Sequence, residues 1–279
     1  MTDKRATGQQ GKALDIKGWL EYSQLHIGLV AIALCSASYS LLESQRNEVV
    51  VLLCFCGATV VYVFDRLVHD GADEANHPSR TRWFEAHRSH IWWLSRLLAV
   101  ACVPLVWMLN PLQILLAAIL ASIGLGYVVP PRPLRDLRRL KPFLIAGAWT
   151  IAVVGLAGLD AGINRGSVLL LLAYRFAYLV PNTMISDLLD APGDRDVGYE
   201  TVATTLTIPQ VKAVVLVSII CAVGILLSGL SFGVLPAIVV LDAAGMLIYL
   251  PFVGNEVTGE RKRFFLDCAL IWPLILVFV

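Results

Sequence analysis

The chain has 279 residues, of which 57% are hydrophobic, and its formal net charge is +1. A mean hydropathy of +0.72 excludes an ordinary soluble domain, and the small net charge gives no overall field that would attract nucleic acid. Six cysteines without a C-x-x-C pair indicate neither a disulfide framework nor a zinc site.

The first segment of the chain is polar. Residues 1–18 lack the apolar core and small-residue cleavage site of a secretory signal. We interpret them as a cytoplasmic tail that precedes a single transmembrane domain, residues 19–279.

Apolar stretches fill most of the remaining chain, and each approaches the length of about 20 residues that spans a bilayer. Spans are predicted at residues 19–42, 49–64, 91–109, 112–129, 143–159, 168–185, 211–230, 234–253 and 264–279. Long polar segments, at residues 65–90, 130–142, 186–210 and 254–263, alternate with short ones. The sequence therefore predicts an all-α, polytopic membrane bundle of about nine transmembrane helices.

Basic residues orient this bundle. Of the 22 lysines and arginines, nineteen lie in the tail, in the long polar segments or at the span ends beside them, whereas only Arg46 and Arg165 lie on the other side. Because basic residues concentrate on the cytoplasmic side of membrane proteins, we expect the N-terminus and every long segment to be cytoplasmic.

The first long segment after a span is rich in acidic residues. Asp65, His69 and Asp73 are spaced i, i+4 and i+8, so a helix continuing past the membrane would place them on one side. Asp70 lies off that face, and Gly71 could let the backbone turn. A transition-metal site is disfavoured because the histidines have no regular ligand spacing.

A second acidic stretch occupies residues 186–201. In a helix, Asp187, Asp190 and Asp194 share one face. We expect Pro192 and Gly193 to break the helix, in which case Asp194 reaches in from a loop. Neighbouring carboxylates repel one another, and Mg²⁺, which prefers oxygen ligands, relieves that repulsion. A solvated acidic loop is the alternative interpretation.

Polar residues also occur inside the predicted spans, where they commonly mark function or a partner. Tyr174, Tyr178 and Asn182 are spaced i, i+4 and i+8, which predicts a stripe leading toward the second acidic stretch. Arg175 lies beside this stripe and needs an anionic partner, for which Asp160 and Asp242 are candidates. Asp267 is expected to extend toward the interface. Glu21, Gln24 and His26 could contact a substrate or the interface.

The two acidic stretches resemble the motifs of the UbiA superfamily of intramembrane prenyltransferases, and the resemblance runs from end to end of the chain. The second motif, D-x-x-D-x-x-x-D followed by R-x-x-G-x-x-T, is matched by Asp187, Asp190, Asp194, Arg195, Gly198 and Thr201. The downstream half of the first motif is matched by Asp73, Asn76, Pro78 and Arg80. Upstream, strict register places Asp65, Arg66 and His69 where the family has Asn, Asp and Asp. Residues 127–141 also resemble a Tyr-Pro-Pro-basic segment of the family.

This resemblance implies a fold in which cytoplasmic Asp-rich segments cap a central cavity. It also implies an isoprenyl diphosphate as substrate and two or more Mg²⁺ ions, replaceable by Mn²⁺, as cofactor. The implied catalytic and metal-binding residues are Asp65, Asp70, Asp73, Asp187, Asp190 and Asp194. The implied substrate-binding residues are Asn76, Arg80, Tyr127, Arg132, Arg135, Lys141 and Arg195, and the polar stripe adds Tyr174, Tyr178 and Asn182 to them. The central ligand of the first motif stays open between His69 and Asp70, and Mg²⁺ chemistry favours the carboxylate of Asp70.

Three functions remain open at this point. The prenyl group could pass to an aromatic or lipid acceptor. The allylic cation could instead close on its own double bonds, as in a UbiA-type terpene cyclase, and the divergent first motif favours a divergent member. In the third interpretation the protein carries an anionic lipid or metabolite without chemistry.

Overall fold

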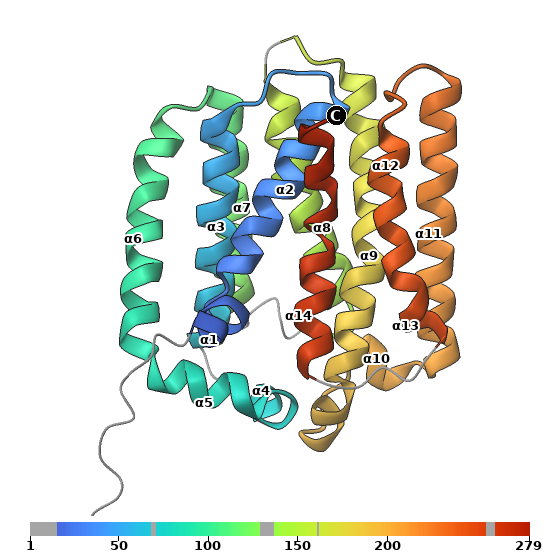
Figure 1. Ribbon diagram of the computed structural model, residues 1–279. Helices are drawn as coiled ribbons and strands as arrows, with labels where there is room; N and C mark the ends of the chain where they lie inside the picture. The colour runs from blue at the N-terminus through green and yellow to red at the C-terminus, as the bar shows by residue number, and fades with distance from the viewer. Residues whose placement is uncertain (1–15, 68–70, 129–136, 161, 255–259) are drawn as a thin grey trace, which may run out of the picture.

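The computed structural model describes residues 16–67, 71–128, 137–160, 162–254 and 260–279, and all regular structure in these ranges is helical. Long helices run side by side between two ends of the molecule, and the short helices α4, α5 and α10 lie across one end (Figure 1). The helices of the N-terminal part are α1 (Ile16–Tyr22), α2 (Leu25–Leu41), α3 (Glu48–Leu67), α4 (Gly71–Asn76), α5 (Pro78–Ala86), α6 (Arg88–Trp107) and α7 (Pro111–Val128). The next helices are α8 (Lys141–Thr150), η2 (Ile151–Gly155), η3 (Ala157–Leu159), α9 (Arg165–Asp196), α10 (Val202–Thr205) and α11 (Ile208–Ser231). The chain ends with α12 (Val239–Ala244), η4 (Gly245–Tyr249), α13 (Leu250–Gly254), α14 (Glu260–Ala269) and η5 (Trp272–Val277).

Several of these helices suit a membrane. Within the described residues, five are long and apolar enough to cross one: α3, α6, α9, α11 and the continuous segment Lys141–Leu159. Shorter apolar helices cover Leu25–Leu41, Pro111–Tyr127 and Val239–Phe252. The all-α membrane fold is thus confirmed, and the count of nine spans stays a prediction.

The outer surface is apolar, as a bilayer requires. Leu97, Val100 and Trp107 are exposed on α6, and Ile220 and Leu227 are exposed on α11. In water such contiguous apolar surface would be unfavourable, whereas lipid tails accommodate it.

Helix α9 is the centre of the bundle. It extends over 32 residues and packs against α8, α11 and α14 within the bundle and against α4 and α10 at its C-terminal end. The predicted break at Pro192–Gly193 is wrong, because the helix continues through both residues to Asp196.

The side chain of Asn76, at the end of α4, explains this continuity. Proline lacks an N–H group and its ring displaces a carbonyl of the preceding turn, so backbone groups near it lose their helical partners. The N–H of Gly193 donates to Asn76 Oδ1 at 2.7 Å, and Asn76 Nδ2 donates to the Asp190 carbonyl at 2.7 Å. A Cβ at position 193 would lie 2.6 Å from the amide of Asn76, so the close approach requires glycine.

The first acidic stretch is divided between two helices. Asp65 lies on α3, whereas Asp73 lies on α4, which packs against α9 and crosses the end of the bundle instead of extending α3 (Figure 1). The prediction that one continuing helix carries both residues is therefore wrong.

Candidate active site

A central cavity of about 810 Å³ lies among α2, α3, α6, α7, α8, α9 and α14. Its volume is in the range of small-molecule sites, and apolar side chains such as Leu53, Val60 and Leu120 form most of its wall. Ionisable side chains gather near the end where α4 and α5 lie: Asp65, Arg66, His77, Arg80, Tyr127, Lys141, Asp187, Asp190 and Arg263. The cavity thus combines an apolar body with a charged end.

Asp190 is held by two donors at this charged end. His77 Nε2 donates to its Oδ1 at 2.8 Å, and Arg263 Nη1 donates to its Oδ2. Burial and the nearby Arg80 lower the pKa of His77 to about 4, although Asp190 opposes that shift. His77 is therefore neutral at physiological pH, with its proton on Nε2, and the formal charge of Asp190 is balanced by Arg263.

Asp187 and Asp194 have oxygens without partners. The Oδ2 of Asp187 accepts from the N–H of Ala203 at 3.1 Å, whereas its Oδ1 is buried and accepts no hydrogen bond. The Oδ2 of Asp194 is likewise buried without a partner. Buried carboxylate oxygens left unsatisfied are costly, which makes this region a favourable place for a cation.

These oxygens fit a hard divalent ion. Carboxylate oxygen is the ligand that Mg²⁺ prefers, and Mg²⁺ commonly takes only one or two protein carboxylates together with substrate phosphates. Among the described residues, no three His, Cys, Asp or Glu side chains form a complete metal site. His69 and Asp70 lie outside the described residues, as does the side chain of Asp73.

Basic groups surround the same end. Lys141 begins α8, Arg80 lies in the first turn of α5, and Arg66 lies near the end of α3. All three line the cavity and could neutralise an anion bound there. Arg132 and Arg135 lie outside the described residues.

The structure brings only some of the predicted substrate residues to the cavity. Tyr127 and Asn182 line it, and Asn182 Nδ2 donates to the Leu266 carbonyl at 3.0 Å. Asn76 has its amide oxygen and nitrogen engaged by α9, as described above. Arg195 is exposed and donates to the Ala203 carbonyl at 3.2 Å, so it fixes the turn after α9.

Tyr174 and Tyr178 do not line the cavity. Tyr174 donates its hydroxyl to Asp242 Oδ2 at 2.7 Å, and Tyr178 packs near Tyr249 with ring centroids 6.4 Å apart. Arg175 binds Asp242 through both Nη atoms at 3.1 Å, so Asp242 is its partner. Asp160 instead accepts from Tyr39 and Gln113.

The downstream half of the second motif has a local structural basis. Gly198 adopts a positive φ of 74°, which a residue with a side chain rarely adopts, and it follows the end of α9. Thr201 caps α10 by accepting from the N–H of Thr204, whose hydroxyl accepts from the N–H of Thr201. These residues hold Ala203 where Asp187 can accept its N–H.

Sequence reasoning assigned no site role to His77, Arg263 or Asp267, which all line the cavity. In the sequence, His77 lies between Asn76 and Pro78, two residues that match the first motif, and this position could have identified it as a site residue. Arg263 and Asp267 are spaced i and i+4 where the last apolar stretch begins, a spacing that places them on one helix face.

No family model matches the sequence, and no curated protein matches it either. Two solved structures, however, match the fold of this chain. A UbiA homolog from Aeropyrum pernix K1, in its apo form, superposes with a TM-score of 0.68 at 16% sequence identity over 90% of this chain and 96% of its own. The structure of a digeranylgeranylglyceryl phosphate synthase superposes with a TM-score of 0.62 at 15% identity over 95% of this chain and 99% of its own. The chain therefore has the fold of the UbiA homolog, as the resemblance of its acidic motifs to the UbiA superfamily predicts.

Proposed function

We propose that the protein is an intramembrane prenyltransferase that ionises an isoprenyl diphosphate and transfers the prenyl group to an aromatic or lipid acceptor. One observation carries the proposal: the unsatisfied carboxylate oxygen of Asp187 and several basic side chains lie together at one end of a largely apolar cavity. A diphosphate with a hydrocarbon tail has the same division into a charged head and an apolar body.

In this proposal the charged end of the cavity binds the diphosphate. Arg80 and Lys141 contribute positive charge to it, and the apolar wall excludes water from the hydrocarbon tail. As the C–O bond breaks, negative charge develops on the leaving diphosphate, and these preorganised cations stabilise it. The aromatic rings of Tyr62, Phe64 and Trp149 line the cavity, where they can stabilise an allylic cation.

Mg²⁺, or Mn²⁺ in its place, would supply further charge neutralisation of the diphosphate when bound. Asp187 and Asp194 offer the unpartnered oxygens for it. Asp190 would join them if its pairing with Arg263 gives way. We extend the proposal to Asp65, Asp70 and Asp73 on the strength of the motif. The basic bias of the sequence supports the further proposal that this end of the cavity faces the cytoplasm.

Two features bear on the acceptor. The name of the digeranylgeranylglyceryl phosphate synthase indicates a glycerophosphate lipid for that protein, and the shared fold supports a lipid alcohol as acceptor here. Arg66 lines the cavity at the position where the family motif has an aspartate; this divergence indicates a divergent member and keeps a terpene cyclase as the alternative.

Incubation of the purified protein with geranyl, farnesyl or geranylgeranyl diphosphate and Mg²⁺ tests the proposal. Each donor is offered with and without a hydroxybenzoate or a glycerolipid that carries a free hydroxyl. We expect a prenylated acceptor. Hydrocarbon formed without acceptor would instead identify a cyclase. If no diphosphate is released, the result would favour a carrier of an anionic lipid or metabolite. EDTA should abolish turnover and added Mg²⁺ should restore it, so full turnover in metal-free protein would contradict the role of the metal.

A further inference from the structure

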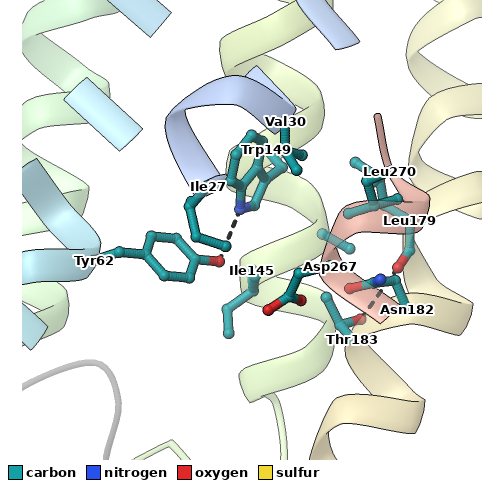
Figure 2. A pocket seen from close by; sticks show the side chains of 11 residues that line it. Ile27, Val30, Tyr62, Ile145, Trp149, Leu179, Asn182, Thr183, Asp267 and Leu270 are labelled. Atoms are coloured by element: carbon teal, nitrogen blue, oxygen red, sulfur yellow. Dashed lines mark hydrogen bonds between the residues drawn. The ribbon is translucent and has the colours of Figure 1, made fainter. Parts of the chain in front are cut away.

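A small recess with a mostly apolar lining and a few polar side chains lies in the wall of the cavity. Its volume is about 30 Å³, enough for one water molecule or one hydroxyl group. Figure 2 shows Tyr62 from α3 and Asp267 from α14 beside it, with Asn182 and Thr183 from α9. These four residues line the large cavity as well, so a molecule in the cavity can place a polar group in the recess.

Asp267 connects the recess to the charged end by its position on α14. It follows Arg263, the partner of Asp190, by four residues, so the two side chains share one helix face, with Cβ atoms about 6 Å apart. Both line the cavity. Asp267 therefore lies one helical turn from the proposed diphosphate site, on the side of the apolar body.

The carboxylate of Asp267 is available for chemistry. Among the described residues it accepts no hydrogen bond, and the Nε2 of His26 lies 3.8 Å from its Oδ2, beyond hydrogen-bond distance. The Nδ1 of His26 is buried without a partner. A purely structural pair would be more fully hydrogen-bonded, as Arg175 and Asp242 are.

The hydroxyl of Tyr62 adds a fixed polar group to the recess. It accepts from Trp149 Nε1 at 3.0 Å, which orients the phenol and leaves its own proton to donate (Figure 2). A hydroxyl group entering the recess would therefore meet a donor in Tyr62 and an acceptor in Asp267. The other described carboxylates of the cavity wall are Glu21, Asp65, Asp187 and Asp190, and the last three lie at the charged end.

We propose that this recess is the acceptor subsite, that it receives a hydroxyl group, and that Asp267 is the base that takes its proton. The inference rests on the proposed prenyl transfer. The C1–O bond of the donor breaks and its electron pair leaves with the diphosphate. A lone pair of the acceptor oxygen forms the new bond to C1, and the hydroxyl proton passes to the carboxylate of Asp267. A lipid alcohol and a phenol share this chemistry.

Asp267→Asn tests the role, because the amide keeps the shape of the side chain and removes the base. With geranylgeranyl diphosphate as donor, we expect transfer to a hydroxyl-bearing glycerolipid or to a hydroxybenzoate to fall about a hundredfold, as for loss of a general base. Donor affinity, measured by quenching of tryptophan fluorescence, should stay within about twofold. Prenyl alcohol, formed when water captures the cation, should become a larger share of the product. Which of the two acceptors is prenylated by the wild type identifies the source of the hydroxyl.

Two further variants control for folding. Asp267→Glu keeps the carboxylate and should retain part of the transfer rate. Cys268→Ser changes the next residue of α14, which does not line the cavity, and should leave the rate within about twofold of the wild type.

Wild-type transfer by a folded Asp267→Asn protein would overturn the subsite while leaving the prenyltransferase proposal intact. Equal losses of donor affinity and turnover would also overturn it, because Asp267 would then belong to the diphosphate site. If the wild type itself releases no diphosphate, the proposed function fails, and the subsite fails with it.

Discussion

Helix α9 contributes one residue to each of two arginine–aspartate pairs, which use the same residue types for different purposes. Arg175 and Asp242 have fully buried side chains, and the carboxylate accepts two bonds from Arg175 and one from Tyr174. Asp190 is shared between Arg263 and His77 at the edge of the cavity, next to carboxylates with unpartnered oxygens. A satisfied carboxylate joins helices, whereas an unsatisfied one beside a cavity can bind a ligand. Residue type alone does not separate the two cases.

The largest expected effect is on stability at Asp242. Asp242→Asn removes the charge that balances Arg175 inside a dry bundle, which should lower the free energy of unfolding by about 3–5 kcal/mol. Thermal denaturation in detergent measures this loss. Replacing both members, Arg175→Met with Asp242→Leu, should recover much of it, because no unpaired charge is left. A stable but inactive Asp242→Asn protein would show that this pair serves catalysis after all.

The second prediction concerns the carboxylates at the charged end of the cavity. Asp187→Asn should lower turnover about a hundredfold, or about 3 kcal/mol, because it removes charge from the site proposed to bind metal and diphosphate. Its melting temperature should change little, since the amide oxygen can still accept from the Ala203 N–H. Asp196→Asn, on the exposed side of the same helix, is the matched control and should stay near wild-type activity. If Asp187→Asn destabilised the protein as much as Asp242→Asn, Asp187 would have a structural role like that of Asp242, and the contrast between the two regions would disappear.

The fold follows from the sequence because the bilayer imposes length and apolarity on each helix. The shared face of Asp187, Asp190 and Asp194 also follows, since their spacing fixes their direction on any helix, and all three are buried. By contrast, Tyr174, Tyr178 and Asn182 do not form the predicted stripe, because only Asn182 lines the cavity. Each step of four residues rotates about 40° beyond a full turn, so residues eight apart diverge by about 80°.

The features that the sequence did not predict depend on contacts between residues far apart in the chain. Asn76 lies 117 residues before Gly193 in the chain, and Arg263 lies 73 residues after Asp190. Local propensity at Pro192 and Gly193 favours a helix end, and only the amide of Asn76 shows why the helix continues. No spacing rule within one segment could have predicted either contact.

The smallest expected effect lies at this contact between the two motifs. Asn76→Ala removes both hydrogen bonds to α9, and Gly193→Ala introduces a Cβ about 2.6 Å from the amide that makes them. Each change should misplace the acidic end of α9 and lower turnover about tenfold, corresponding to about 1–2 kcal/mol. Gly224→Ala in α11 meets no neighbouring atom and should be silent.

A double-mutant cycle distinguishes this positioning role from direct substrate binding by Asn76. If both residues act through one contact, the Asn76→Ala/Gly193→Ala protein should be little worse than either single variant, because alanine at position 76 also makes room for the new Cβ. Turnover rates and donor affinities of all four proteins supply the cycle. Strictly additive losses, with donor affinity falling only in the Asn76 variants, would instead make Asn76 a ligand of the substrate, as the motif resemblance implies. The geometry favours the first result, since the amide oxygen and nitrogen of Asn76 already bind the two backbone groups on either side of Pro192.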